Sequence, residues 1–216
     1  MKFIKLLKNT QIYFCLPYYG LVLGYLIPVI IMEKAVAEIA QYSDFGLGLD
    51  ICFPIIAVIF SLNVYKNTVK FSATNNISRH KSFFNVISSI LLMTLYMTAV
   101  AFITYGLFDG EKSQYFFFFT RYLKFNVLSH KIIAFSSLLM IAMLITAAVS
   151  ALLAKFRLSG VAAAIIIFLM ISTPKWLYYH DAFLNDIFPV FIVIFLLSLA
   201  ILAYSMHRQN TIALQK

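Results

Sequence analysis

The sequence predicts an all-α polytopic membrane protein with six transmembrane helices and both termini in the cytoplasm. Three observations support this fold class. Hydrophobic residues make up 62% of the 216 residues and charged residues only 12%, whereas soluble domains carry about 45–50% apolar and about 25% charged residues. The apolar residues form six sustained runs, most of them close to the roughly 20 residues that a transmembrane helix needs. The acidic and basic residues segregate between the segments that connect these runs.

The six runs form a single transmembrane domain over residues 1–216, without a separate soluble domain. They are continuous and lack the alternation of a membrane β-barrel, so a helix is expected in each. The first run follows a short basic segment and is too long for the apolar region of a cleaved signal peptide, so it is expected to remain as an anchor. The predicted spans are residues 11–32, 50–65, 85–108, 131–154, 160–174 and 187–205.

The distribution of charge predicts the orientation. If the N-terminus is cytoplasmic, the inner segments carry 11 of the 17 basic residues and none of the eight acidic residues. Cytoplasmic loops of membrane proteins carry an excess of Lys and Arg, which favours this N-in, C-in topology. The net charge of +9 then reflects topology and attraction to anionic lipid. Nucleic acid is not an expected partner, because no folded basic domain is present to bind it.

Polar groups within the predicted spans are few. No span contains an ionisable residue away from its ends, which disfavours a proton-coupled transporter. The third span carries Thr94, Thr98 and Tyr105 on one helical face. These side chains either bond locally to backbone and neighbouring helices or form a weakly polar lining for an amphipathic passenger.

Catalytic and metal-binding signals are weak. The four histidines form no pair at metal-ligand spacing, and no phosphate-binding GxxxxGK[ST] loop occurs. Cys15 and Cys52 begin consecutive spans of opposite direction, so both are expected to remain thiols. His180 and Asp181 are either an acid–base couple of a lipid-modifying enzyme or a solvated pair in an outer loop. We expect no catalytic residue, no metal and no cofactor bound by this chain.

Two further patterns concern packing and the membrane surface. Gly20 and Gly24 form a GxxxG motif, and small residues recur at 146, 150 and 154. Small residues allow close helix approach in lipid, either within the chain or against a second subunit. The outer segment 115–125 mixes aromatic and basic side chains, as interfacial helices do. It is either an aromatic belt or a landing surface for an amphipathic substrate.

The cytoplasmic segment 66–84 is the most informative. Asn76 can adopt the left-handed backbone conformation that ends a turn. Ser78 is a suitable N-cap for a helix that continues through Arg79 and Lys81 into the third span. The expected result is a short helix near the membrane surface that presents charged and aromatic side chains to the cytoplasm. A basic connector that faces lipid is the alternative.

The residues Asn-Ile-Ser-Arg-His-Lys-Ser-Phe-Phe at 76–84 resemble the G-[IT]-S-R-[RK]-x-F-F segment in permease subunits of bacterial ABC exporters of the second class. Asn76 stands where glycine is common, and both residue types tolerate left-handed geometry. The six-span layout and the basic turn 155–160 are also similar. In that family the segment is part of the coupling helix, which docks into the ATPase. The resemblance implies this role for Asn76, Ile77, Ser78, Arg79, Lys81, Phe83 and Phe84.

The resemblance further implies a permease of the bacterial cell membrane without ATPase activity of its own. It is closest to the split permeases of Gram-positive bacteria that export amphipathic peptides, including bacteriocins and phenol-soluble modulins. Its expected partners are a cytosolic ABC ATPase, which binds ATP and Mg²⁺, a second permease, identical or related, and membrane lipid. An immunity or sensor protein that sequesters an antimicrobial peptide without transport is the alternative from another functional class.

Overall fold

The computed structural model describes residues 8–24, 49–107, 128–153 and 188–213 of the chain. Within them every regular element is a helix, which confirms the all-α prediction. The N-terminal helix covers residues 8–24 and contains one π-helical stretch. The elements are η1 (Gln11–Cys15), α3 (Leu49–Thr74), α4 (Arg79–Leu107), α5 (Leu128–Leu153) and α8 (Phe188–Ala213).

Three of the described helices are long and apolar enough to cross a membrane, which supports assignment of the chain as a membrane protein. Their membrane-crossing segments are Cys52–Thr74, Arg79–Gly106 and Leu128–Leu152. These segments correspond to the second, third and fourth predicted spans. In α8 the apolar stretch Ile192–Met206 is shorter. The predicted first span is described only as far as residue 24, and the predicted span 160–174 lies outside the described residues.

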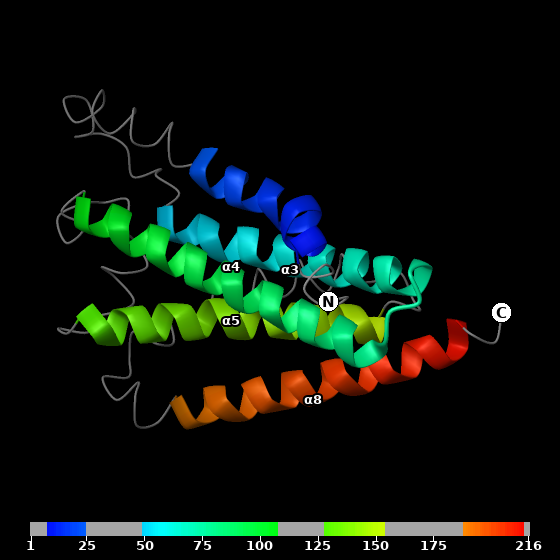
Figure 1. Ribbon diagram of the computed structural model, residues 1–216. Coiled ribbons are helices and arrows are strands. Elements are labelled where there is room, and N and C mark those ends of the chain that lie inside the picture. The colour runs from blue at the N-terminus through cyan, green and yellow to red at the C-terminus, as the bar shows by residue number, and fades with distance from the viewer. Residues whose placement is uncertain (1–7, 25–48, 108–127, 154–187, 214–216) are drawn as a thin grey trace.

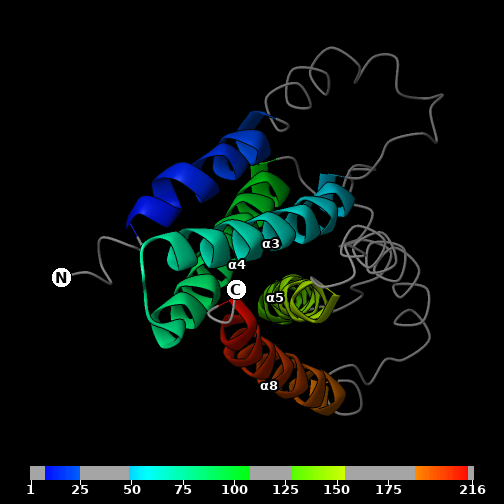
Figure 2. The ribbon, with the colours of Figure 1, turned by 90° about the vertical axis from the view of Figure 1, so that its right-hand side faces the viewer.

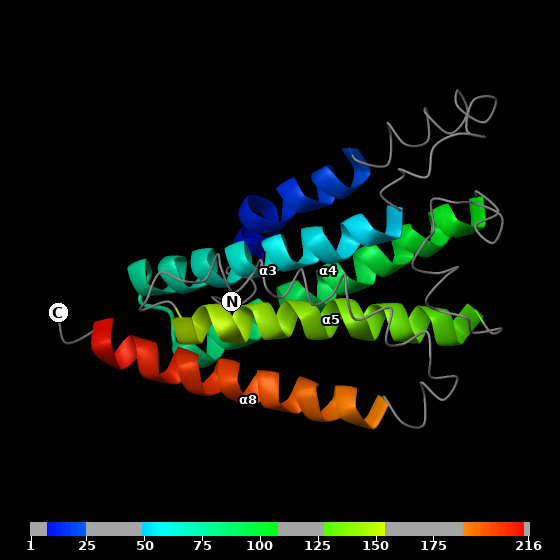
Figure 3. The ribbon, with the colours of Figure 1, turned by 180° about the vertical axis from the view of Figure 1, so that it is seen from behind.

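The helices form a bundle with α5 near its centre (Figures 1 and 2). α3 and α4 form an antiparallel hairpin on one side of α5, and α8 packs on the other side. The N-terminal helix lies against the outside of α3 and α4. We call the end of the bundle that holds Thr74 and Arg79 the hairpin end. α5 and α8 run in the same direction and both end toward the hairpin end (Figure 3).

The π-helical stretch of the N-terminal helix has a local cause. Residues 11–15 form a π-helical stretch that ends two residues before Pro17. Proline has no backbone N–H, and its ring clashes with the carbonyl four residues earlier, here that of Tyr13. A widened turn relieves this clash, as π turns do inside otherwise regular helices. The helix then continues to residue 24.

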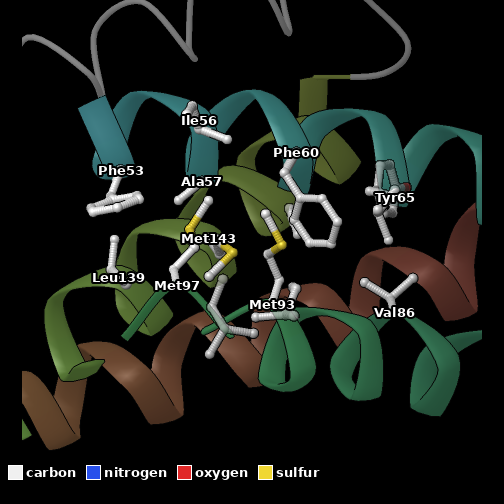
Figure 4. Close-up of a cluster of buried hydrophobic side chains, with 14 of the residues drawn as sticks. Phe53, Ile56, Ala57, Phe60, Tyr65, Val86, Met93, Met97, Leu139 and Met143 are labelled. Atoms are coloured by element: carbon white, nitrogen blue, oxygen red, sulfur yellow. The ribbon is translucent and has the colours of Figure 1, made fainter. Parts of the chain in front are cut away.

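The core is built from large side chains of three helices (Figure 4). Its largest fully buried members are Phe53, Phe60, Ile90, Met93, Met97, Phe135, Leu139 and Met143. A polar contact joins two of the helices inside this core, where the Ser61 hydroxyl of α3 donates to the Met143 carbonyl of α5. Lipid tails are as apolar as the side chains, so packing and such interhelical hydrogen bonds hold helices together in a membrane.

Candidate functional site

The candidate site is the turn between α3 and α4 together with the first turns of α4. Asn76 has a φ of 51°, as predicted. The Ile77 N–H donates to the Ser72 carbonyl over 2.9 Å, which is the bond that defines a Schellman C-cap. α4 then begins at Arg79, and the Ser82 N–H donates to the Ser78 carbonyl over 3.1 Å. Ser78 therefore occupies the predicted N-cap position.

The segment is not a separate short helix. α3 continues as a helix to Thr74, well beyond the predicted end of the second span at residue 65. Arg79 and Lys81 belong to the first turn of a 29-residue helix that runs without interruption to Leu107. The predicted coupling segment 66–84 therefore comprises the last turns of α3, the turn that follows and the first turns of α4. We call residues 75–84 the hairpin tip.

The side chains of the tip divide by exposure. Asn76, Ser78 and Lys81 are exposed, whereas Ile77 and Arg79 are partly buried. The two aromatic residues also differ. Phe84 is 56% exposed, whereas Phe83 packs against the hydrophobic core, and their rings meet edge to face at 5.7 Å between centroids. Phe84 is therefore the aromatic side chain that the tip exposes.

The charge at this end of the hairpin has one sign. Lys66 and Lys70 are exposed on the last turns of α3, and Lys81 is exposed on α4. No Asp or Glu occurs anywhere in residues 51–107. The hairpin end of α3 and α4 thus presents a basic surface, which suits either anionic lipid or an acidic protein surface.

The predicted polar face of α4 is buried in the bundle. The Thr94 hydroxyl donates to the Ile90 carbonyl over 2.9 Å, so it bonds locally. Thr98 is buried, and its hydroxyl has no hydrogen-bond partner within the described part of the chain. Tyr105 is buried, and Lys131 donates to its hydroxyl over 3.3 Å.

Lys131 is the functional candidate that sequence reasoning missed. It is only 8% exposed, and its ammonium also lies 5.5 Å from the centre of the Tyr105 ring. The sequence placed it at the outer start of the fourth span, where a lysine side chain ordinarily reaches water. Its burial depends on how α4 and α5 pack, which no local pattern in the sequence indicates.

The N-terminal helix is held by polar contacts that were not predicted. The Asn85 amide of α4 donates to the Thr10 hydroxyl over 2.8 Å. The Tyr96 hydroxyl donates to the Tyr19 carbonyl over 3.0 Å, and the two rings meet with centroids 4.8 Å apart. The N-terminal helix is therefore tied to the same hairpin that carries the tip.

Gly20 and Gly24 lie on the exposed side of the N-terminal helix. A Cβ atom built on either glycine would meet nothing within 4 Å. The GxxxG motif is therefore not used for packing within the described part of the chain. Its small surface remains accessible to lipid or to another helix.

The remaining predicted features give no site in the described residues. Cys15 is buried and Cys52 is partly buried, and both are thiols as predicted. No group of three or more His, Cys, Asp or Glu residues that could hold a metal occurs in the described ranges. The pair His180 and Asp181, the aromatic segment 115–125 and the basic turn 155–160 lie outside the described residues.

The chain matches no protein-family model, no curated protein and no solved structure.

Proposed function

We propose that this chain is the permease subunit of an ATP-driven transporter and that a separate cytosolic ATPase acts on the hairpin tip. One observation carries the proposal. Two helices, each long enough to cross a membrane, are joined by a turn of only four residues, 75–78. Their shared end presents exposed basic and aromatic side chains.

This geometry is suited to transmit force. A helix keeps its hydrogen bonds when one end is pushed, so a displacement at the tip moves the whole of α3 and α4, whereas a long loop would absorb it. At 1.5 Å per residue, the 29 residues of α4 extend about 43 Å. The hydrocarbon core is about 30 Å thick, so the tip would stand at or beyond the lipid head groups, where a cytosolic protein can bind it.

The tip also suggests the chemistry of the partner surface. Lys81 supplies an exposed cation, and Phe84 supplies an exposed ring beside it. A partner that binds both should offer acidic side chains around an apolar pocket. An ABC ATPase with such a cleft would bind ATP and Mg²⁺, while this chain performs no covalent chemistry.

The proposal includes six spans with both termini in the cytoplasm. α5 ends toward the hairpin end, whereas α8 begins at the opposite end and runs parallel to α5 (Figures 1 and 3). The chain must therefore return to the opposite end between Leu153 and Phe188, and the six-span proposal assigns a fifth span to this return. The basic, acid-free hairpin end would then face the cytoplasm.

We further propose that a second permease, identical or related, packs against the exposed GxxxG surface. Gly20 and Gly24 leave room for a neighbouring helix, and small residues at this spacing commonly mediate helix association in lipid. A cavity between two such permeases would carry hydrophobic or amphipathic peptides outward across the bacterial cell membrane. Movement of the two hairpins would change the side to which this cavity opens.

Affinity purification of the tagged chain from its native membrane in mild detergent, followed by mass spectrometry, tests the proposal. We expect a stoichiometric ABC ATPase. The variants Arg79→Glu and Lys81→Glu should lose it, while abundance in the membrane is unchanged. Lys66→Glu makes the same change of charge on the hairpin outside the tip and should retain the ATPase. Purification without an ATPase would refute the proposal and favour a sequestering immunity protein.

A further inference from the structure

The hairpin end of the core contains a layer of buried hydroxyl groups. They belong to α3, α5 and α8, and each residue is at most 4% exposed. Their oxygen atoms have no hydrogen-bond partner among the residues that the structure describes. We call these residues the hydroxyl layer: Thr68, Ser72, Ser150 and Ser205.

This behaviour differs from that of other hydroxyls in the same bundle. A buried Ser or Thr within a helix commonly donates to the carbonyl four residues earlier. Thr104 does so in α4, Thr146 in α5 and Ser198 in α8, over 2.8, 2.7 and 2.7 Å. The residues of the hydroxyl layer do not, although a buried hydroxyl without a partner destabilises the structure that contains it.

The register of α3 and α5 brings two members of the layer to the same level. Ser61 of α3 bonds to Met143 of α5, and the two helices run in parallel (Figure 3). Seven residues are two helical turns and return a side chain to the same face. Thr68 follows Ser61 by seven residues on α3, and Ser150 follows Met143 by seven residues on α5. Thr68 and Ser150 therefore lie at one level along the bundle, two helical turns nearer the hairpin end.

The core farther from the hairpin end is mostly apolar, although Thr98 of α4 also has a buried hydroxyl without a partner among the described residues. Farther from the hairpin end, Phe60 of α3 and Met93 of α4 pack with Met143 of α5 (Figure 4). A gap between apolar side chains stays dry, whereas water occupies buried sites that offer several hydrogen-bonding groups. If the helices separated, water would thus enter the polar part of the core and not the apolar part.

We infer that the hydroxyl layer is a binding site for water, filled when α5 separates from α3 at the hairpin end. Each hydroxyl can donate one hydrogen bond and accept others, so water between the helices would satisfy Thr68 and Ser150 together. The packing described here is then the closed state of an inner gate. This inference goes beyond the proposed function and does not require an ATPase.

Labelling of single cysteines in the full chain tests the inference. In a background with Cys15→Ala and Cys52→Ala, Thr68→Cys and Ser150→Cys would be exposed to a small hydrophilic methanethiosulfonate reagent. Ala57→Cys and Ala134→Cys are matched controls, because both residues are buried at 0% and 1% exposure on the same two helices. Local opening that admits water should make the layer positions react about tenfold or more faster than the controls. Reaction at the control rate would overturn the inference.

A thermal measurement provides a second test that needs no reagent. Thr68→Val and Ser150→Ala remove unpartnered hydroxyls and should raise the melting temperature of the purified chain, since the closed state loses a buried polar group. Ser61→Ala removes a hydroxyl with a partner, the Met143 carbonyl, and should lower it. If Thr68→Val lowers the melting temperature as Ser61→Ala does, the hydroxyl of Thr68 is satisfied in the closed state and the inference is wrong.

Discussion

Replacement of Asn76 tests how strongly the hairpin depends on one backbone conformation. Asn76 has a φ of 51°, and residues with a Cβ atom pay about 1–2 kcal/mol for the left-handed region, which Asn enters more readily than most. Asn76→Ala should therefore lower the free energy of unfolding by about 1 kcal/mol. If the backbone leaves this conformation, the bond from the Ile77 N–H to the Ser72 carbonyl is also lost, at a further cost of about 1 kcal/mol.

Reversible unfolding of the purified chain in mixed micelles, titrated with sodium dodecyl sulfate, would measure this change. A loss of 1–2 kcal/mol shifts the ratio of folded to unfolded chain by a factor of about 5–30. Asn76→Gly is the control, because glycine adopts a positive φ readily and should leave stability within a few tenths of a kcal/mol. Equal stability of the Ala and Gly variants would refute this expectation, because it would show that the positive φ at position 76 has no effect on the free energy of unfolding.

Three further predictions follow from contacts described above. Phe83→Ala should destabilise the chain by about 3 kcal/mol or less, since its ring is only partly buried. Phe84→Ala removes only the edge-to-face contact with Phe83, so it should lower stability by about 1 kcal/mol or less and weaken association with the ATPase in the pull-down. Asn85→Ala removes the amide that holds the N-terminal helix and should cost about 1–3 kcal/mol, with faster proteolysis of that helix as the readout; unchanged proteolysis would argue against a structural role. Gly20→Leu combined with Gly24→Leu should reduce cross-linked dimer without changing the melting temperature, because a Cβ at either position meets no neighbour among the residues that the structure describes; undiminished cross-linking would place the subunit interface elsewhere.

The helical fold could be predicted because the apolar runs leave the backbone no other way to satisfy its hydrogen bonds in lipid. The end of α3 could not be predicted by the same reasoning. Residues 66–74 look polar in composition, yet Lys66 and Lys70 face outward while Thr68 and Ser72 face the core. A hydropathy pattern counts these hydroxyl residues as the end of an apolar span. In the structure, helix α3 continues through them to Thr74.

The candidate site likewise combines features that the sequence predicts with features that it does not. The turn at Asn76 and the cap at Ser78 depend on local backbone geometry, which a few adjacent residues determine. The burial of Lys131, the contact of Asn85 with Thr10 and the difference between the two phenylalanines of the tip depend on which helices become neighbours. Residues that are adjacent in the sequence carry no information on that choice.

The polar contacts of the N-terminal helix have a consequence for biogenesis. That helix is synthesised before its hydrogen-bond partners. Asn63, whose amide donates to the Tyr18 hydroxyl, and the partners Asn85 and Tyr96 lie 45, 75 and 77 residues after the residues they contact. At about 5–20 residues per second, a separation of 75 residues corresponds to a delay of roughly 4–15 s during translation. The helix must therefore remain undocked until the α3–α4 hairpin has been made. Nascent chains arrested before Asn85 would hold an undocked N-terminal helix, and its contacts with the α3–α4 hairpin would form only after the hairpin has left the ribosome.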